Sequence, residues 1–231
     1  MRNYFGVHNH TDRSNIRLLD CINRPKALID KAIELGLSGI AITDHECLSA
    51  HMEVNQYAKK IKETHPDFKI ALGNEIYLVK TREPKQKYFH FILIAKDAIG
   101  HKALRELSSI AWYNVYVDRG MERVPITWDE LREVMNKYKG HVIATTACMG
   151  GELSTYALTM SVAEDKGEKD IVQDCYSHIV DFMTDCLDIF GNDFYIECAP
   201  AASKEQIIVN KMLYNIAQSF NVNMVIGSDA H

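Results

Sequence analysis

Residues 39–45 read Gly-Ile-Ala-Ile-Thr-Asp-His, a short apolar run that ends in an aspartate and a histidine. A continuous apolar run of this length is typical of a strand that is buried on both faces of a parallel sheet. Helices are expected on either side of it, at residues 25–35 and 49–62. Pro25 suits the first turn of the earlier helix, and Gly36 suits its end. The stretch therefore predicts a helix–strand–helix unit of an α/β fold, with polar side chains where the strand ends.

The same alternation of strands and helices continues along the chain. Six further strands are expected, at residues 4–8, 69–75, 89–95, 141–146, 194–198 and 223–226. Further helices are expected at residues 102–113, 128–137, 169–190 and 204–220, and a loop at residues 114–125. Repeated strand–helix units predict a parallel sheet, whose short buried strands could either lie open or close into a barrel.

The chain has 231 residues, with 31 acidic and 26 basic side chains and a formal net charge of −5. This length suits one α/β barrel of roughly 200–250 residues, and the mild acidity excludes a strongly basic nucleic-acid clamp. No apolar run reaches the roughly 18–20 residues that cross a bilayer, and the N-terminus has no signal-peptide pattern. The six cysteines include no Cys-x-x-Cys pair, so we expect reduced thiols in a cytoplasmic protein without membrane contact.

Ten histidines are present, and five of them stand with other metal-binding side chains on or just after the expected strands. The candidates are His8 and His10, Asp44 and His45, Glu75, His90, Cys148, and Asp229 and His231. In parallel α/β folds, functional groups gather at the carboxyl ends of the strands, so these distant residues are expected to be neighbours. Imidazole and carboxylate ligands suit zinc, manganese or iron, and a cysteine thiolate favours zinc.

Each candidate also has a simpler interpretation. Asp44 could cap a turn, His90 could be a hydrogen-bonded core residue, and Cys148 could serve packing alone. Metal-binding side chains at six separate strands are difficult to obtain by chance, so the combination favours a metal site. The other five histidines fall mainly on helices or before strands, and we assign them to packing or to the surface.

Six motifs, which are spread over essentially the whole chain, resemble one family. They are Val7-His8-Asn9-His10-Thr11 followed by Leu18-Leu19-Asp20, Ile42-Thr43-Asp44-His45, Gly73-Asn74-Glu75-Ile76-Tyr77, His90-Phe91-Ile92-Leu93-Ile94-Ala95-Lys96, Thr146-Ala147-Cys148-Met149-Gly150-Gly151-Glu152 and Gly227-Ser228-Asp229-Ala230-His231. These motifs resemble the PHP (polymerase and histidinol phosphatase) domain. Their spacing is most similar to the branch at the N-terminus of bacterial DNA polymerase III alpha subunits. One difference is that serine and alanine flank Asp229, where that branch more often has asparagine and valine.

The resemblance implies a distorted (β/α)7 TIM-like barrel with a metal cluster at the carboxyl ends of its strands. Two to three divalent ions (Zn²⁺, Mn²⁺ or Fe²⁺) are expected, with no catalytic group beyond the metal-bound water. Asp44 is expected to orient a ligand from behind. The ligands that the resemblance implies are His8, His10, Asp20, His45, Glu75, His90, Cys148, Asp229 and His231, of which Asp20 comes from the resemblance alone.

The resemblance also implies a function in DNA replication. Residues 1–231 would be the PHP domain at the N-terminus of a larger replicative DNA polymerase, with the polymerase domain outside this chain and other replisome subunits as partners. The expected activity is metal-dependent phosphoester hydrolysis, as a 3′–5′ exonuclease that acts on the 3′ end of DNA. Arg119 and Arg123 are candidate phosphate contacts, although both could belong to a solvated loop.

Two alternatives stay open. The domain could be a metal-stabilised structural or docking platform of the polymerase, without catalysis of its own. The chain could also be a free-standing phosphatase of the histidinol-phosphate or nucleotide type.

His231 is the last residue, so its terminal carboxylate would lie beside the metals, and we expect it to be the most readily displaced ligand.

Overall fold

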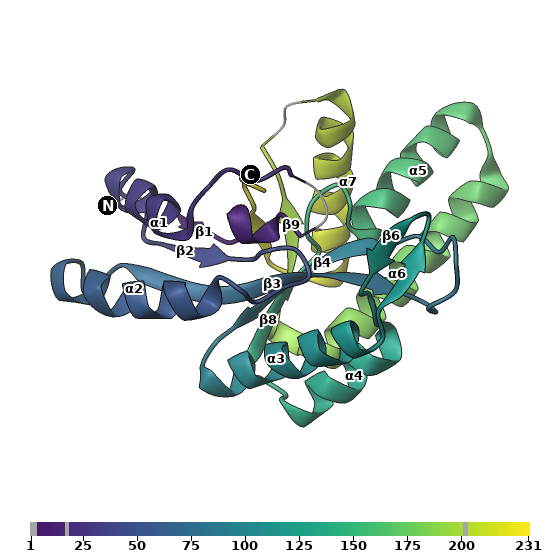
Figure 1. The fold of residues 1–231 in the computed structure, drawn as a ribbon. Coiled ribbons are helices and arrows are strands. Elements are labelled where there is room, and N and C mark those ends of the chain that lie inside the picture. The colour runs from purple at the N-terminus through teal and green to yellow at the C-terminus, as the bar shows by residue number, and fades with distance from the viewer. Residues whose placement is uncertain (1–3, 17–18, 201–202) are drawn as a thin grey trace.

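Seven strands of an eight-stranded sheet curl into a nearly closed barrel (Figure 1). The computed structural model describes residues 4–16, 19–200 and 203–231, so Leu18 of the first motif lies outside the described residues. The backbone N–H of His10 donates to the carbonyl of Ala230 at 2.9 Å and joins the chain beyond the first strand to the chain beyond the last. The predicted barrel is therefore confirmed. The order around it is β1 (Phe5–Gly6), β2 (Gly39–Ile42), β3 (Lys69–Val79), β4 (Phe89–Ala95), β8 (Val142–Thr145), β9 (Phe194–Cys198) and β10 (Met224–Ile226).

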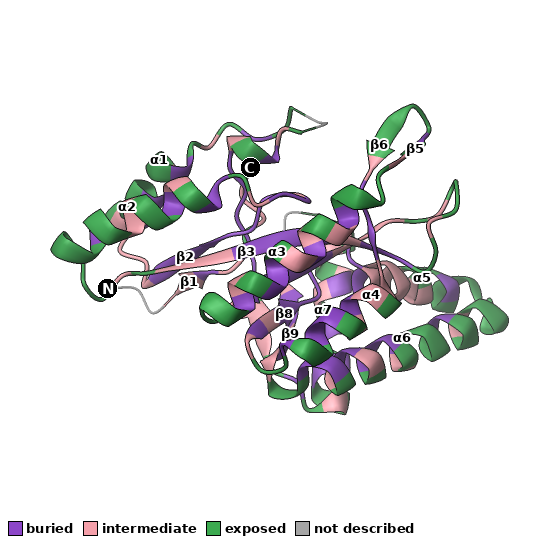
Figure 2. Ribbon diagram, turned by 60° about the horizontal axis from the view of Figure 1, so that its bottom comes forward, coloured by how far each residue is buried: buried purple, intermediate pink, exposed green. Residues whose placement is uncertain are grey.

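Helices cover the outside of the barrel. In the described chain they are α1 (Pro25–Glu34), α2 (His51–Thr64), α3 (Ala98–Tyr113), α4 (Trp128–Lys137), α5 (Glu152–Lys166), α6 (Lys169–Phe190) and α7 (Lys204–Phe220). The first two pack with β2 in one apolar cluster around Ile40 and Ile42, and the others share a larger core around Phe91 and Leu93. Figure 2 shows buried residues on the strands and on the helix faces turned toward them. None of the described helices is both long and apolar enough to cross a membrane.

Side-chain caps set where two of the helices begin. Thr127 and Glu130 form a capping box, in which each side chain accepts the backbone N–H of the other residue. This box starts α4 at the predicted residue. Asp97 accepts the N–H groups of Ile99 and Gly100, both at 2.9 Å, and starts α3 at Ala98 rather than at the predicted residue 102.

β4 runs antiparallel to both of its neighbours, β3 and β8. The prediction of a parallel sheet is therefore wrong for this strand. The reason is the connection from β3, because residues 80–88 form no helix and a parallel crossover needs a dozen or more residues. A short return of this kind joins antiparallel strands. The reversal brings the first residues of β4 to the edge of the barrel where the parallel strands end.

The sequence predicts a loop for residues 114–125, but the structure has two short strands in this segment. β5 (Tyr116–Asp118) and β6 (Met121–Arg123) form a hairpin, which projects from the barrel in Figure 2. Arg119 and Gly120 at its tip have φ of 51° and 77°, and tight hairpin turns of type I′ require such positive values. After the hairpin, β7 (Ile126–Thr127) pairs with the end of β3.

Two other elements differ from the prediction. β1 is shorter than residues 4–8, since only Phe5 and Gly6 pair with β2. α5 was not predicted at all, because its apolar residues do not gather on one face as they do in the other helices. It packs against α6 and α7 instead of presenting one apolar face to the sheet.

Candidate metal centre

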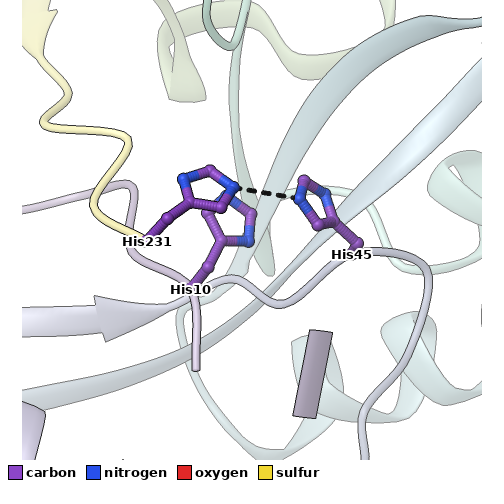
Figure 3. Close-up of side chains that lie close together, drawn as sticks. All are labelled: His10, His45 and His231. Atoms are coloured by element: carbon purple, nitrogen blue, oxygen red, sulfur yellow. Dashed lines mark hydrogen bonds between the residues drawn. The ribbon is translucent and has the colours of Figure 1, made fainter. Parts of the chain in front are cut away.

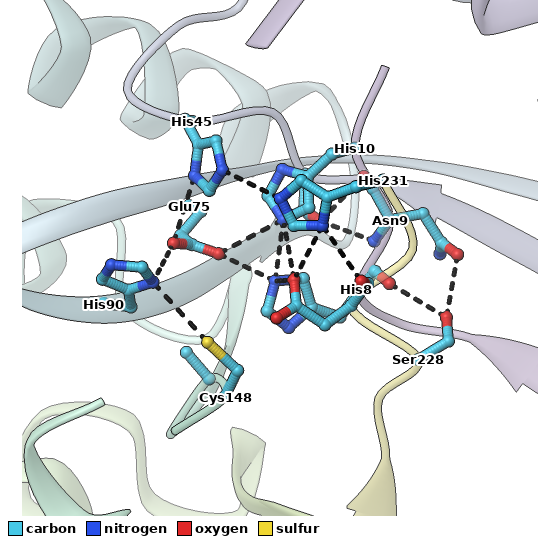
Figure 4. A network of polar contacts seen from close by, with 12 residues as sticks. His8, Asn9, His10, His45, Glu75, His90, Cys148, Ser228 and His231 are labelled. Atoms are coloured by element: carbon cyan, nitrogen blue, oxygen red, sulfur yellow. Dashed lines mark hydrogen bonds and ion pairs between the residues drawn. The ribbon is translucent and has the colours of Figure 1, made fainter. Parts of the chain in front are cut away.

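The predicted ligands meet at the edge of the barrel where the parallel strands end (Figure 4). His8 and His10 follow β1, His45 follows β2, and Glu75 lies within β3. His90 is the second residue of β4, and the reversed direction of this strand is what brings it to the same edge. The other predicted ligands follow β8 or β10, or lie in the chain after β1: Cys148, Asp229, His231 and Asp20.

Four donor atoms face a common point at the centre of this cluster. His8 Nε2 lies 2.9 Å from His10 Nε2 and 2.7 Å from Glu75 Oε2. Asp229 Oδ1 lies 3.2 Å from His8 Nε2 and 3.3 Å from His10 Nε2. His8, His10 and Glu75 are each 0% exposed. Two imidazole nitrogens and two carboxylate oxygens that converge in a buried place form a donor set that suits a divalent cation.

Glu75 presents its two carboxylate oxygens to four histidines. Oε2 faces His8 and His10, at 2.7 and 3.4 Å. Oε1 faces Nδ1 of His90 at 2.5 Å and Nδ1 of His45 at 3.2 Å. Burial by itself would raise the pKa of Glu75, but His90 and the other three histidines hold this pKa well below its usual value. Each of the two carboxylate oxygens of Glu75 would thus be able to hold a cation together with the histidines that it faces.

A second group of donor atoms is formed by three histidines, His10, His45 and His231 (Figure 3). His45 Nε2 lies 3.2 Å from His231 Nε2. The ring of His10 stacks on the other two, with centroid distances of 4.1 Å to His45 and 4.4 Å to His231. His10 is buried and His231 is exposed, so this group leads from the buried centre to the surface.

Asp20 belongs to a third group of donor atoms, together with Cys21 and His231. The structure thus brings Asp20 beside His231 at the edge of the cluster. Cys21 is buried beside these donors, and its thiol donates to Asp20 Oδ1 at 3.2 Å. Burial and the adjacent Asp20 carboxylate raise the pKa of this thiol to about 12.

Cys148 lies beside His90 (Figure 4). Its Sγ is 3.6 Å from His90 Nδ1. Burial, and then the negative charges of Glu75 and Asp229, raise the pKa of the Cys148 thiol. The thiol is therefore protonated at neutral pH, and it can become a ligand only when a bound cation displaces its proton.

One residue that sequence reasoning missed holds His8 in place. Glu197 in β9 is buried, and its Oε1 accepts a hydrogen bond from Nδ1–H of His8 at 2.6 Å, while Oε2 accepts the hydroxyl of Thr145 at 2.5 Å. Burial lowers the pKa of His8, but Glu197 and Glu75 together raise it well above its ordinary value. With Nδ1 occupied, Nε2 is the nitrogen that can bind a cation. A carboxylate inside the apolar run Phe194–Cys198 was the signal that could have found Glu197.

Asp44 is buried and lies behind two of the histidines. Its Oδ1 accepts the backbone N–H of Thr11 at 2.6 Å and the hydroxyl of Ser14 at 2.8 Å. Ser14 Oγ in turn lies 3.3 Å from His10 Nδ1 and accepts the backbone N–H of His45 at 3.1 Å. Asp44 therefore acts on His10 and His45 through Ser14.

Replacing Glu197 by glutamine is expected to weaken metal binding by about 10–100-fold. A neutral amide can bond either tautomer of His8, so it no longer holds Nε2 free for a cation. Isothermal titration of the metal-free protein with Mn²⁺ measures the change. Glu205→Gln, at an exposed position on α7, is the matched control. Equal affinities of the two variants would show that Glu197 does not orient His8.

The backbone beside the ligands is strained at three places. Glu46, Ala147 and Asp229 have φ of 52°, 57° and 47°, although non-glycine residues avoid this region at a cost of roughly 1–2 kcal/mol. Each of the three is a proposed ligand or directly follows or precedes one, and strain of this kind is concentrated at functional sites. Gly227 is constrained too, since a Cβ there would lie 1.9 Å from Oε1 of Glu197.

The two candidate phosphate contacts differ in position. Arg123, at the end of β6, lines a narrow cleft of about 40 Å³ together with Asp20, His45 and Tyr77. Its guanidinium carbon lies 4.9 Å from the centre of the Tyr88 ring. The side chain of Arg119 at the hairpin tip is 62% exposed, lies 3.8 Å from Asp118 and does not line this cleft. The structure thus brings Arg123, and not Arg119, beside the cluster.

Known proteins with similar sequences indicate the same family as the sequence motifs do. A model of the PHP domain matches residues 7–201. The chain is similar to the probable DNA polymerase YorL of Bacillus subtilis, with 42% identity over 98% of this chain and 18% of that protein. It is also similar to the DNA polymerase III subunit alpha of Borreliella burgdorferi, with 31% identity over 99% of this chain and 18% of that protein. The chain thus spans less than a fifth of the length of these relatives.

Solved structures share the fold at low sequence identity. A candidate metal-dependent phosphoesterase from Bifidobacterium adolescentis aligns over 100% of this chain and 88% of its own, with a TM-score of 0.55 and 14% identity. An amidohydrolase from Chromobacterium violaceum aligns over 98% of this chain and 87% of its own, with the same TM-score and identity. These similarities support the barrel architecture.

Proposed function

The chain belongs to the PHP domain family, and from this premise we propose that its metal centre hydrolyses phosphoesters. The observation that carries the proposal is Glu75, whose two oxygens face His8 and His10 on one side and His45 and His90 on the other. The site would hold two to three divalent ions, Zn²⁺, Mn²⁺ or Fe²⁺. When bound, such ions polarise a phosphoester and lower the pKa of a water toward neutrality.

The protein side chains divide the work between them. The proposed ligands would hold the ions: His8, His10, Asp20, His45, Glu75, His90, Cys148, Asp229 and His231. Glu197 would orient His8 directly, and Asp44 would orient His10 and His45 through Ser14. Because the ions supply both nucleophile and electrophile, no serine or cysteine nucleophile is required. Arg123 would bind a phosphate of the substrate from the cleft beside His45.

The proposed substrate is the 3′ end of DNA, which makes the domain a 3′–5′ exonuclease within a larger replicative polymerase. The relatives that support this are DNA polymerases. We propose that residues 1–231 form the PHP domain of such a protein, with the polymerase domain and other replisome subunits as partners.

The test is hydrolysis of a 3′-labelled single strand by the chain after reconstitution with Mn²⁺ or Zn²⁺. Progressive shortening from the 3′ end is expected, and His8→Ala should abolish it because His8 contributes to the central donor group. Turnover of a generic phosphomonoester with none on DNA would favour the phosphatase alternative instead. Absence of cleavage by the metal-loaded protein would refute the proposed nuclease activity.

A structural function is the second candidate, and the complete burial of His8, His10 and Glu75 favours it. A buried cluster of this kind can stabilise the barrel by binding metal to the folded state alone. In that case EDTA lowers the melting temperature steeply, while the metal-loaded protein hydrolyses neither DNA nor phosphomonoesters. The two candidates therefore differ in activity rather than in metal content.

Replacing Arg123 by alanine is expected to lower kcat/KM on an oligonucleotide by about 10–100-fold, the value of a lost charge-assisted contact of about 1.5–3 kcal/mol. Arg119→Ala is the matched control on the same hairpin, and it should stay within about twofold because its exposed side chain makes only a surface contact. Steady-state kinetics of the two variants checks this. An equal loss of kcat/KM in both variants would mean that the hairpin acts through its overall positive charge rather than through a direct contact between Arg123 and a phosphate.

A further inference from the structure

The hairpin of β5 and β6 has two different faces. Residues directly opposite each other, and residues two apart along one strand, lie on the same side of an antiparallel pair. The register therefore puts four side chains on one face, which we call the inner face: Tyr116, Asp118, Met121 and Arg123. Val117 and Glu122 alternate with them and are exposed. The inner face turns toward the chain between β3 and β4 and toward the cleft beside His45.

Asp118 is a buried carboxylate next to the hairpin turn, and it is 5% exposed. Its Oδ1 accepts the backbone N–H of Lys85 at 3.3 Å, and its Oδ2 accepts the hydroxyl of Tyr88 at 3.1 Å. Arg119 Nε lies 3.8 Å from the same Oδ2. A buried charge is unfavourable unless it is hydrogen-bonded, so the bonds to Lys85 and Tyr88 fix the hairpin to the connection between β3 and β4.

Tyr88 is held at its hydroxyl group by two residues of the inner face. Its single hydroxyl proton goes to Asp118, because an ionised carboxylate only accepts hydrogen bonds. The hydroxyl of Tyr116, 2.8 Å away, is then the donor to the Tyr88 oxygen. Burial and these two partners raise the pKa of Tyr88, so the phenol is protonated at neutral pH and keeps this direction of donation.

The ring of Tyr88 in turn carries the guanidinium of Arg123. The guanidinium carbon lies 4.9 Å from the ring centre, which is within the range of a cation–π contact. Among the described residues, Nε of Arg123 is buried and has no hydrogen-bond partner. Arg82 in the same region is different, since it forms an ion pair with Glu130. The orientation of Arg123 is therefore set by the Tyr88 ring, and its charge is left for an anion in the cleft.

We propose that Asp118 is a positioning residue for Arg123, which it holds through Tyr88 in the orientation that binds a phosphate group of the substrate. This inference rests on the proposed function, because it takes the substrate to be a phosphoester. The hydrogen bond to Asp118 fixes the Tyr88 ring and adds electron density to it, which strengthens the contact with the guanidinium. A guanidinium that is already oriented loses less conformational entropy when it binds a phosphate.

Tyr88→Phe tests the link, because it removes the hydroxyl and keeps the ring. We expect KM for a single-stranded oligonucleotide to rise by about 3–10-fold, the value of one lost hydrogen bond, with kcat within about twofold. In an Arg123→Ala background the same substitution should have no further effect. Tyr57→Phe on α2 is the matched control, since Tyr57 also donates to an aspartate, Asp30, and it should leave both constants unchanged.

The orientation of Arg123 can also be measured without catalysis, from the ¹H–¹⁵N signal of its side-chain Nε–H in the full chain without added metal. The Tyr88 ring should shift this signal upfield of the other arginine signals, and its loss in Arg123→Ala identifies it. In Asp118→Ala and in Tyr88→Phe the signal should move to the position of the exposed arginines. In Tyr57→Phe it should stay in place.

Two results would overturn the proposal. One is an Nε–H signal that Asp118→Ala and Tyr88→Phe leave in place, even if the melting temperature falls, because Asp118 would then have a structural function only. The other is a rise in KM from Tyr88→Phe that persists in the Arg123→Ala background. If the parent chain cleaves no oligonucleotide, the proposed function fails, and the Nε–H signal alone decides whether Asp118 positions Arg123.

Discussion

A Glu75→Gln variant is expected to lose at least about 10³-fold of its phosphoesterase activity, equivalent to about 4 kcal/mol of transition-state stabilisation. Glu75 is the one described side chain that faces four histidines at once. A glutamine presents one oxygen and one NH₂ group, so it can face a cation on only one side. The metal stoichiometry should also fall, because the variant lacks one of the carboxylate oxygens that would hold the ions.

Elemental analysis and the oligonucleotide assay measure these two effects on the same preparation. Glu83→Gln, at an exposed position in the connection between β3 and β4, is the matched control and should retain both metal and activity. Circular dichroism verifies that the Glu75→Gln protein is folded. A folded variant with full metal content and full activity would exclude Glu75 as a metal ligand.

The metal-free protein is expected to be most stable between about pH 4.5 and 6.5 and to lose stability as the pH rises further. His8, His10 and His90 have raised pKa values in the folded state, because Glu75 and other carboxylates outweigh the effect of burial. Their contribution is fully present below the ordinary histidine value of 6.5 and disappears as the pH passes the folded pKa values. At alkaline pH, the uncompensated carboxylates are left buried together.

At low pH the stability of the metal-free protein falls for the opposite reason, because carboxylates take up protons. Glu75 has a pKa held well below its ordinary value of 4.5, and His10 and His8 lower the pKa of Asp229 to about 2 despite its burial. The stabilisation from these carboxylates is present above their ordinary values and disappears as the pH falls through the folded ones. Both limits therefore arise from one buried cluster of opposite charges.

Bound metal should reverse the alkaline part of this profile. Cations bind neutral imidazole and compete with protons, so metal affinity rises with pH. We expect the melting temperature of the EDTA-treated protein to fall by roughly 5–10 °C between pH 6 and 9, from about 2–3 kcal/mol of lost stability. The Mn²⁺-loaded protein should show no such fall.

Thermal denaturation across this pH range, with Mn²⁺ or with EDTA, measures both curves. Glu197→Gln is an internal check, because Glu197 is a principal cause of the raised pKa of His8, and the alkaline fall should be smaller in this variant. Parallel curves with and without metal would show that the cluster does not exchange protons for cations.

Much of the architecture could be predicted from the local sequence. Apolar runs such as residues 39–43 bury both faces and can only be inner strands, and the intervening amphipathic segments can only be helices against them. Seven strands and all helices except α5 follow from this pattern. The direction of β4 did not follow from it, because direction depends on whether the connecting chain is long enough to cross the sheet, and residues 80–88 are not.

The candidate site likewise has residues that the sequence predicts and residues that only the folded chain brings together. The residue types and their positions on or after the parallel strands predicted which side chains would meet, since parallel strands end at one edge, whereas His90 reaches them from the antiparallel β4. Asp20 and Cys21 carry no such signal, because they come together with His231 only through the path of the chain between β1 and α1.

By itself, the sequence determined the strands, most of the helices and the set of ligand types that the barrel presents at one end, because these follow from burial and from the alternation of side chains along a strand. Only the tertiary structure decided that His90 joins the site from a reversed strand, that Glu75 lies among four histidines, and that Glu197 holds His8. These contacts join residues as far apart as positions 8 and 197, and their distances depend on how the barrel closes rather than on any local pattern.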